Sequence, residues 1–188
     1  MKARGTSRFD PAVGRRLRKL REARGISLSA LARSASVGKA TLSGLENGTR
    51  NPTLETMYAI ASALAVPMSV LTLDPGAPVS AASPVRGAAV VGTLLEVFEE
   101  PAATYELLRM RVIAGVEQSS PAHPPGVTEH VTVFQGILRA GPADAPLVAY
   151  PDEHISWTAD VPHTYAAVGD QDVLATLLIR TPRAGSLL

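Results

Sequence analysis

The sequence predicts a two-part, multi-domain molecule: an all-α bundle of five short helices followed by an all-β barrel. Apolar residues recur with helical spacing only before residue 74. Residues 74–87 read DPGAPVSAASPVRG, which is rich in Pro, Gly, Ser and Ala and has no periodicity. Beyond them only short alternating or β-rich runs occur, separated by Gly and Pro turns, as is typical of a sandwich or barrel.

These patterns divide the 188 residues into four segments. We expect a flexible basic arm at 1–9, a helical domain at 10–73, a linker at 74–87 and a β-barrel domain at 88–188. The chain has no cysteine, which excludes disulfides and thiolate-bound zinc and fits a reducing cytoplasm. No signal peptide or membrane-length apolar run is present, so we expect a cytoplasmic protein with no membrane partner.

The first two predicted helices follow from apolar spacing and capping residues. Val13, Leu17 and Leu20 lie at i, i+4 and i+7, which places them on one face of a helix. Ser27 is the expected N-cap of the second helix, at 28–35, because its hydroxyl can accept a hydrogen bond from the first turn.

Three further helices complete the predicted bundle. The turn SVG leads to a third helix at 39–47, and Thr53 is the expected cap of a fourth. Met57 and Leu64 lie seven residues apart on the inner face of that fourth helix. Pro67 suits the first position of a short fifth helix.

Charge is distributed very unevenly along the chain. Residues 1–52 hold twelve Lys or Arg against three Asp or Glu, a net charge of +9. Residues 53–188 hold six against fourteen, a net charge of −8. This asymmetry predicts a polyanion partner for the helical domain only, although a solvated basic helix would show the same excess.

The second and third predicted helices are joined by a tight turn, an arrangement that fits the major groove of DNA. Leu42 and Leu45 would pack inward, and small polar residues would face outward, where bulk would hold the backbone away from base edges. Gly44 weakens this helix by roughly 1 kcal/mol, which indicates either close approach to DNA or a tolerated weak position. The residues expected to contact DNA are Lys39, Ala40, Thr41, Ser43, Gly44, Asn47, Thr49, Arg50 and Asn51.

Residues 27–71 resemble the XRE family, the lambda-repressor-like helix-turn-helix proteins. The matching features are Val-Gly-Lys-x-Thr-Leu-Ser in the turn and third helix, Leu-Glu-Asn-Gly after it, and Asn-Pro-Thr-Leu-Glu-Thr before the fourth helix. The resemblance implies a DNA-binding domain with its third helix in the major groove. The sequence departs from the family at Leu28, where a Gln is frequent, and at Gly44, where an Arg is frequent.

The barrel part contains a candidate polar site. In EHVTVFQG alternate residues face opposite sides of a strand, so Glu129 shares a face with Val131 and Val133, whereas His130 points away. Phe134 and Trp157 are expected in the barrel core. We expect four residues to line a ligand pocket: Val131, Val133, Trp157 and Tyr165.

Two histidines and a glutamate can converge on the same interior. His123, Glu129 and His163 provide two imidazoles and a carboxylate, a donor set that suits Zn²⁺, Fe²⁺, Mn²⁺ or Ni²⁺. Buried histidines are also often satisfied polar groups with no ligand role. A bound metal, a bound small molecule and trapped water therefore all remain open.

Residues 105–180 resemble the cupin fold, a small double-stranded β-barrel, through HPPGVTEHVTVFQG and WTADVPHTY. The cupin resemblance implies that His123, Glu129 and His163 are the ligands of a metal. Pro121 stands where the family has the first histidine of its motif, and Asp152 stands in place of a usual glycine.

A DNA-binding head joined to a barrel with a pocket predicts a ligand-responsive transcription regulator. We expect a homodimer that binds double-stranded DNA at a palindromic operator and responds to a small-molecule effector. Two alternatives stay open. The barrel is a metal-dependent oxygenase or isomerase that carries a DNA-binding head, or it serves for dimerisation alone.

Overall fold

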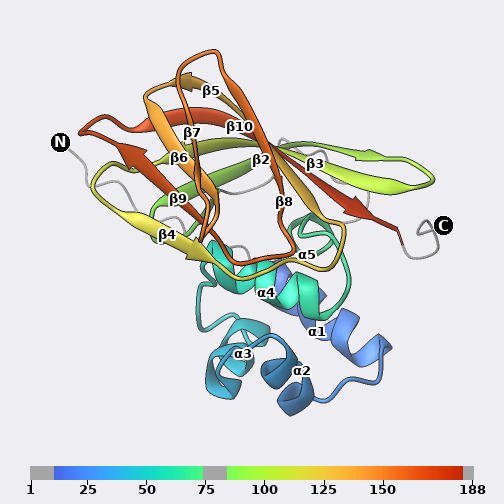
Figure 1. Cartoon of the computed structure of the whole chain (residues 1–188). Coiled ribbons are helices and arrows are strands. Elements are labelled where there is room, and N and C mark those ends of the chain that lie inside the picture. The colour runs from blue at the N-terminus through green and yellow to red at the C-terminus, as the bar shows by residue number, and fades with distance from the viewer. Residues whose placement is uncertain (1–10, 74–83, 184–188) are drawn as a thin grey trace.

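The computed structural model describes residues 11–73 and 84–183, and the predicted arm at 1–9 lies outside these ranges. It confirms the expected fold, a five-helix head followed by a cupin-type barrel of antiparallel strands (Figure 1). The helices are α1 (Pro11–Ala23), α2 (Leu28–Ser34), α3 (Lys39–Glu46), α4 (Leu54–Ala63) and α5 (Ser69–Thr72). None of the described helices is long and apolar enough to cross a membrane.

The helix boundaries follow local capping chemistry. The Ser27 hydroxyl accepts a hydrogen bond from the backbone N–H of Ala30 at 3.1 Å, and Thr53 accepts one from Thr56 at 3.3 Å. Both predicted N-caps are therefore confirmed. The fifth helix begins later than expected, at Ser69, so Pro67 precedes that helix and is not its first residue.

Ten strands in the described part of the chain form the barrel. They are β1 (Val85–Arg86), β2 (Val90–Glu99), β3 (Ala103–Val112), β4 (Glu117–Ser120), β5 (Thr128–Gln135), β6 (Ile137–Pro142), β7 (Leu147–Ala149), β8 (His154–Thr158), β9 (His163–Val168) and β10 (Val173–Pro182). One sheet has the order β1-β2-β3-β10-β5-β8 and the other β4-β9-β6-β7. Their inner faces supply the apolar core of the barrel.

Two expectations for the barrel need correction. Val85 and Arg86 pair with β2, so the strand-rich part begins before residue 88, inside the segment expected to be a linker. Residues 74–83 of that segment lie outside the described ranges. Phe134 is not in the core: 56 % of it is exposed, because it lies near the end of β5, where alternation turns it away from the interior.

The head packs directly against the barrel through α4 and α5, whereas α2 and α3 lie on the far side of the bundle (Figure 1). Glu106 of β3 accepts hydrogen bonds from the backbone N–H groups of Met68 at 3.3 Å and Ser69 at 2.5 Å. Glu55 of α4 accepts one from Ala88 at 3.1 Å. Specific polar contacts therefore join the two parts, in addition to the chain connection between them.

Candidate functional site

The outer surface of α3 presents the expected small and polar residues. Lys39 and Ala40 are exposed, Thr41 and Ser43 are half-buried, and Leu42 is completely buried beneath them. α3 faces away from the barrel (Figure 1), so the barrel does not block its approach to DNA. The arrangement matches a helix that enters the major groove with its N-terminal residues toward base edges.

Gly44 is the exception, because the structure places it under other side chains. A Cβ atom at this position would lie 2.9 Å from Cγ of Arg50 and 3.3 Å from Oγ1 of Thr49. The glycine is buried, and the stem of Arg50 lies over it. The missing side chain makes room for the loop after α3, so the burial of Gly44 does not support the interpretation of close approach to DNA.

The loop after α3 holds the remaining candidate DNA contacts. Asn47, Thr49, Arg50 and Asn51 are all exposed. The Thr49 hydroxyl donates to the backbone carbonyl of Gly44 at 3.1 Å, and an Arg50 Nη1 donates to the Thr41 hydroxyl at 3.4 Å. These bonds hold the loop beside α3, so a guanidinium lies next to the helix that is expected to meet DNA.

The barrel brings the three predicted metal ligands together. His123 lies in the loop between β4 and β5, Glu129 lies on β5 of the larger sheet, and His163 begins β9 of the smaller sheet. One donor atom from each side chain lies within 4.8 Å of the other two. Glu129 and His163 are almost completely buried, so the cluster lies between the two sheets.

The hydrogen bonds orient these donors for a cation. Nδ1 of His163 lies 3.0 Å from the carbonyl oxygen of Val161, which can only accept, so Nδ1 carries the proton. Nε2 of a neutral His163 is then free to donate an electron pair. Nε2 of His123 lies 3.0 Å from Oε1 of Glu129, at hydrogen-bond distance. A divalent ion bound to both atoms would take the place of the proton between them. The donor set fits a divalent metal held by these three residues.

Glu129 is held in its charged form. Burial alone would raise its pKa, but the hydrogen bond from His123, the positive charge that His163 and His123 can carry and the hydrogen bond from Tyr165 outweigh burial. The pKa of Glu129 therefore lies below its ordinary value. The Tyr165 hydroxyl donates to Oε2 of Glu129, which leaves Oε1 toward the two histidines.

The four predicted pocket residues separate into two pairs. Trp157 and Tyr165 flank the ligand set, with ring centroids 6.3 Å and 5.7 Å from that of His163. Val131 and Val133 are completely buried in the barrel core. His130 lies on the opposite face of β5 and points away from the site, as expected. Its ring stacks on that of His154, with ring centroids 5.7 Å apart.

Comparison with known proteins places the chain in a family. Residues 17–71 match the helix-turn-helix model HTH_3. The HTH-type transcriptional regulator SutR of Escherichia coli strain K12 is 34 % identical over 169 residues, which cover 89 % of this chain and 94 % of the relative. The chain belongs to the XRE-type helix-turn-helix transcriptional regulators.

Solved structures of XRE-type and HTH_3 regulators resemble the chain. An HTH_3 family transcriptional regulator from Vibrio cholerae is 26 % identical, with a TM-score of 0.77 and coverage of 93 % of this chain and 98 % of that one. The Cupin_2 domain of an XRE family regulator from Enterobacter cloacae is 28 % identical over 50 % of this chain and 99 % of its own, with a TM-score of 0.46.

In this XRE-type regulator, sequence reasoning missed the residues at the contact between head and barrel. Tyr58 of α4 meets the His123 ring edge-on, with centroids 5.1 Å apart and planes at 84°. Glu106 is a buried carboxylate on β3 that meets α5. One signal was available for Glu106, a carboxylate at a buried position of an alternating strand. Tyr58 gave no such signal, because an aromatic residue on an apolar helix face looks like ordinary core.

Proposed function

We propose that the barrel of this transcriptional regulator senses a small effector, through a divalent metal held by His123, Glu129 and His163, and that this binding changes the affinity of the head for its operator. The helical head would bind DNA, and the barrel, which begins with β1 at Val85, would sense and dimerise. The regulator would act in the cytoplasm as a homodimer on a palindromic double-stranded operator. Its candidate DNA contacts are the exposed or half-buried α3 and loop positions named above, without the buried Gly44.

One observation carries this proposal: the candidate metal ligand His123 contacts Tyr58, a residue of the DNA-binding head. An effector changes DNA affinity only if it binds differently to two arrangements of the molecule. Direct contact between a ligand residue and α4 supplies a place where occupancy of the barrel can alter the position of the head. The proposal assigns the barrel no catalytic step.

The test compares operator affinity with and without Zn²⁺, Fe²⁺, Mn²⁺ or Ni²⁺, on an operator selected from random DNA. We expect one of these ions to raise the free energy of unfolding by about 2.7 kcal/mol at 100 times its dissociation constant. It should also change the fluorescence of Trp157, whose ring lies 6.3 Å from that of His163.

His163→Ala should abolish the thermal and operator responses while leaving DNA binding by the metal-free protein intact. His154→Ala is the matched control, because His154 is exposed on β8 and lies outside the ligand cluster. Responses that survive in His163→Ala would overturn the proposal. So would a wild-type protein that binds none of the four ions.

A further inference from the structure

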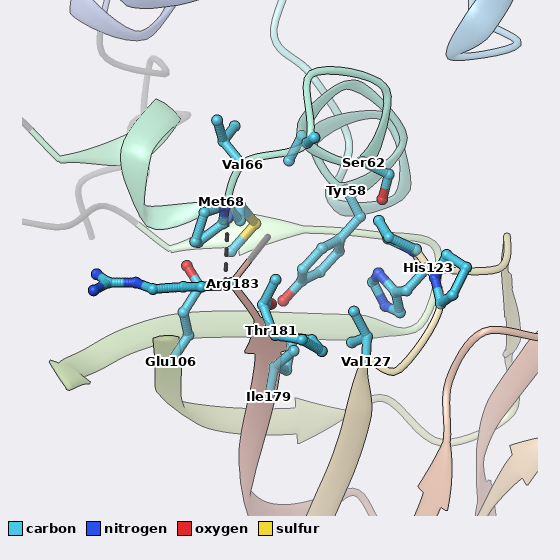
Figure 2. Close-up of a pocket in the computed structure, with 16 residues that line it drawn as sticks. Tyr58, Ser62, Val66, Met68, Glu106, His123, Val127, Ile179, Thr181 and Arg183 are labelled. Atoms are coloured by element: carbon cyan, nitrogen blue, oxygen red, sulfur yellow. Dashed lines mark hydrogen bonds between the residues drawn. The ribbon is translucent and has the colours of Figure 1, made fainter. Parts of the chain in front are cut away.

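A cavity of about 280 Å³ lies between the head and the barrel (Figure 2). α4 and the turn before α5 form one wall, and the end of β10 and the loop that carries His123 form the other. Most of its lining is apolar, including Ala61, Val66, Val127 and Ile179. A concave, mainly apolar space with a few polar groups is the usual form of a small-molecule site.

One polar group in this cavity has no partner. The Tyr58 hydroxyl is buried, and no hydrogen-bond partner for it exists among the described residues. Figure 2 shows Tyr58 projecting from α4 into the space between Met68 and His123. Burial of an unpaired hydroxyl is unfavourable, so a ligand that offers an acceptor there would gain a hydrogen bond that the empty cavity does not supply.

The charges around the cavity favour an uncharged ligand. Glu106 lines the cavity, but both its oxygens already accept backbone N–H groups. The Glu106 carboxylate places a negative charge on the wall of the cavity near the Tyr58 hydroxyl. Arg183, which also lines the cavity, is exposed and paired with Glu99 at 2.8 Å. A carboxylate placed at Tyr58 would therefore be repelled.

We infer that this interdomain cavity binds a small, uncharged, mainly apolar molecule, to whose carbonyl-type oxygen the Tyr58 hydroxyl donates a hydrogen bond. A cavity of roughly 150 Å³ holds benzene, so this one suits a molecule of about ten non-hydrogen atoms. Such a ligand contacts both head and barrel. Its effect on DNA binding rests on the proposed function, whereas the binding itself does not.

Three probes of equal size test this inference on the full chain. Acetophenone carries a carbonyl group, α-methylstyrene replaces that oxygen with carbon, and benzoate carries a charge. The protein is labelled with ¹³C at its methionine methyl groups, and each probe is titrated by NMR. Met68 lines the cavity, whereas Met110 lies in the barrel core and serves as the internal control.

We expect acetophenone to shift the Met68 signal. It should bind about two- to tenfold more tightly than α-methylstyrene, because of these two probes only acetophenone can accept the hydrogen bond from Tyr58. Benzoate should bind most weakly. Tyr58→Phe keeps the ring and should abolish the preference for acetophenone while retaining α-methylstyrene binding. A melting curve like that of the wild type shows that this variant is folded.

Two results would overturn the inference. One is a Met68 signal that none of the probes shifts, and the other is a preference for acetophenone that persists in Tyr58→Phe. Failure of the metal proposal is distinguishable, since His163 does not line the cavity and His163→Ala should still bind acetophenone. Conversely, if no probe shifts the Met68 signal, the metal titration of the wild type still tests the metal proposal independently.

Discussion

Lys39 and Arg50 illustrate how neighbouring cations can serve different purposes on one surface. Lys39 starts α3 and is exposed, so its side chain can extend toward a base edge. Arg50 instead lies across Gly44 and donates to Thr41, which places its charge beside the helix. A cation in that position contacts the phosphate backbone more naturally than a base.

Substitution of these two cations should therefore have different consequences. Lys39→Ala should cost about 1–3 kcal/mol of operator affinity and relax specificity at one base pair. Arg50→Ala should weaken binding to all DNA sequences by a similar factor. It should also reduce the slope of log affinity against log salt concentration by about one. Fluorescence anisotropy with operator variants, at several salt concentrations, measures both effects. Arg109→Ala on the exposed barrel surface is the control, and an identical profile for all three variants would contradict the assignment.

Glu106 is buried in an interface, and its titration should affect stability. Burial raises the pKa of Glu106, although hydrogen bonds from Ser69 and Met68 oppose the rise. A carboxyl with a raised pKa in the folded state binds its proton more tightly there than in the unfolded chain. Its contribution to stability is therefore complete below the unfolded pKa and declines as pH rises through the folded pKa.

The free energy of unfolding of the wild type, minus that of Glu106→Gln, should accordingly fall as pH rises above about 4.3, the ordinary pKa of glutamate. Urea denaturation at a series of pH values measures this difference. Glu96→Gln, at an exposed position of β2, should show no such trend. A difference for Glu106→Gln that does not vary with pH would show that this carboxyl does not titrate in the range.

Among the elements, α1 and α3 approach each other closely at one glycine. A Cβ atom at Gly14 would lie 2.2 Å from the backbone carbonyl oxygen of Leu45. Beside this contact, Arg21 of α1 makes two hydrogen bonds to Glu46 of α3, at 2.6 Å and 2.8 Å. The position of the third helix is thus set by backbone contact and a paired charge as well as by apolar packing.

Two glycine substitutions separate backbone crowding from side-chain crowding. Gly14→Ala should destabilise the fold by about 1–3 kcal/mol or more, because the obstacle is backbone of a neighbouring helix. Gly44→Ala should change stability by less than about 1 kcal/mol, since Arg50 can move and the helix gains propensity. Thermal unfolding measures both. Equal losses of stability in the two variants would mean that the Arg50 side chain cannot move aside for the added methyl group.

For the whole molecule, the basic head and the acidic barrel define one DNA-facing end. α3 lies on the side of the head that is remote from the barrel (Figure 1). A single head covers few base pairs, so specific binding calls for two heads on half-sites about one helical turn, roughly 34 Å, apart. In the proposed dimer the docked barrel would contribute to this geometry, because its contacts with α4 and α5 restrict where each head can point.

Operator spacing provides a test of the dimer. Native mass spectrometry should give twice the 19.7 kDa mass of the chain. Lengthening the operator by half a helical turn between its half-sites should reduce affinity strongly, since the two heads would then face opposite sides of the duplex. Lengthening by a full turn should restore part of the affinity. Affinity that does not depend on spacing would show that the heads bind independently.

Sequence by itself determined the features that depend on neighbours along the chain. Ser27 and Thr53 cap their helices within three residues, and strand alternation alone placed Glu129 on the inner face of β5. The sequence also suggested that His123 and His163 could converge with Glu129, and the cupin resemblance implied that all three bind a metal. Local hydrogen bonding and side-chain periodicity act over a few residues, so these features are readable from the sequence.

Tertiary structure alone decided which groups meet across long separations. The carboxylate of Glu106 meets the start of α5 from 37 residues away, and Tyr58 meets the ring of His123 from another domain. Gly44 proved to be covered by Arg50, and Phe134 proved to be exposed. The composition of 74–87 predicts a separate head, yet α4 and α5 are docked on the barrel. A docking contact depends on the shapes of two folded surfaces, and it therefore has no period or motif in the sequence.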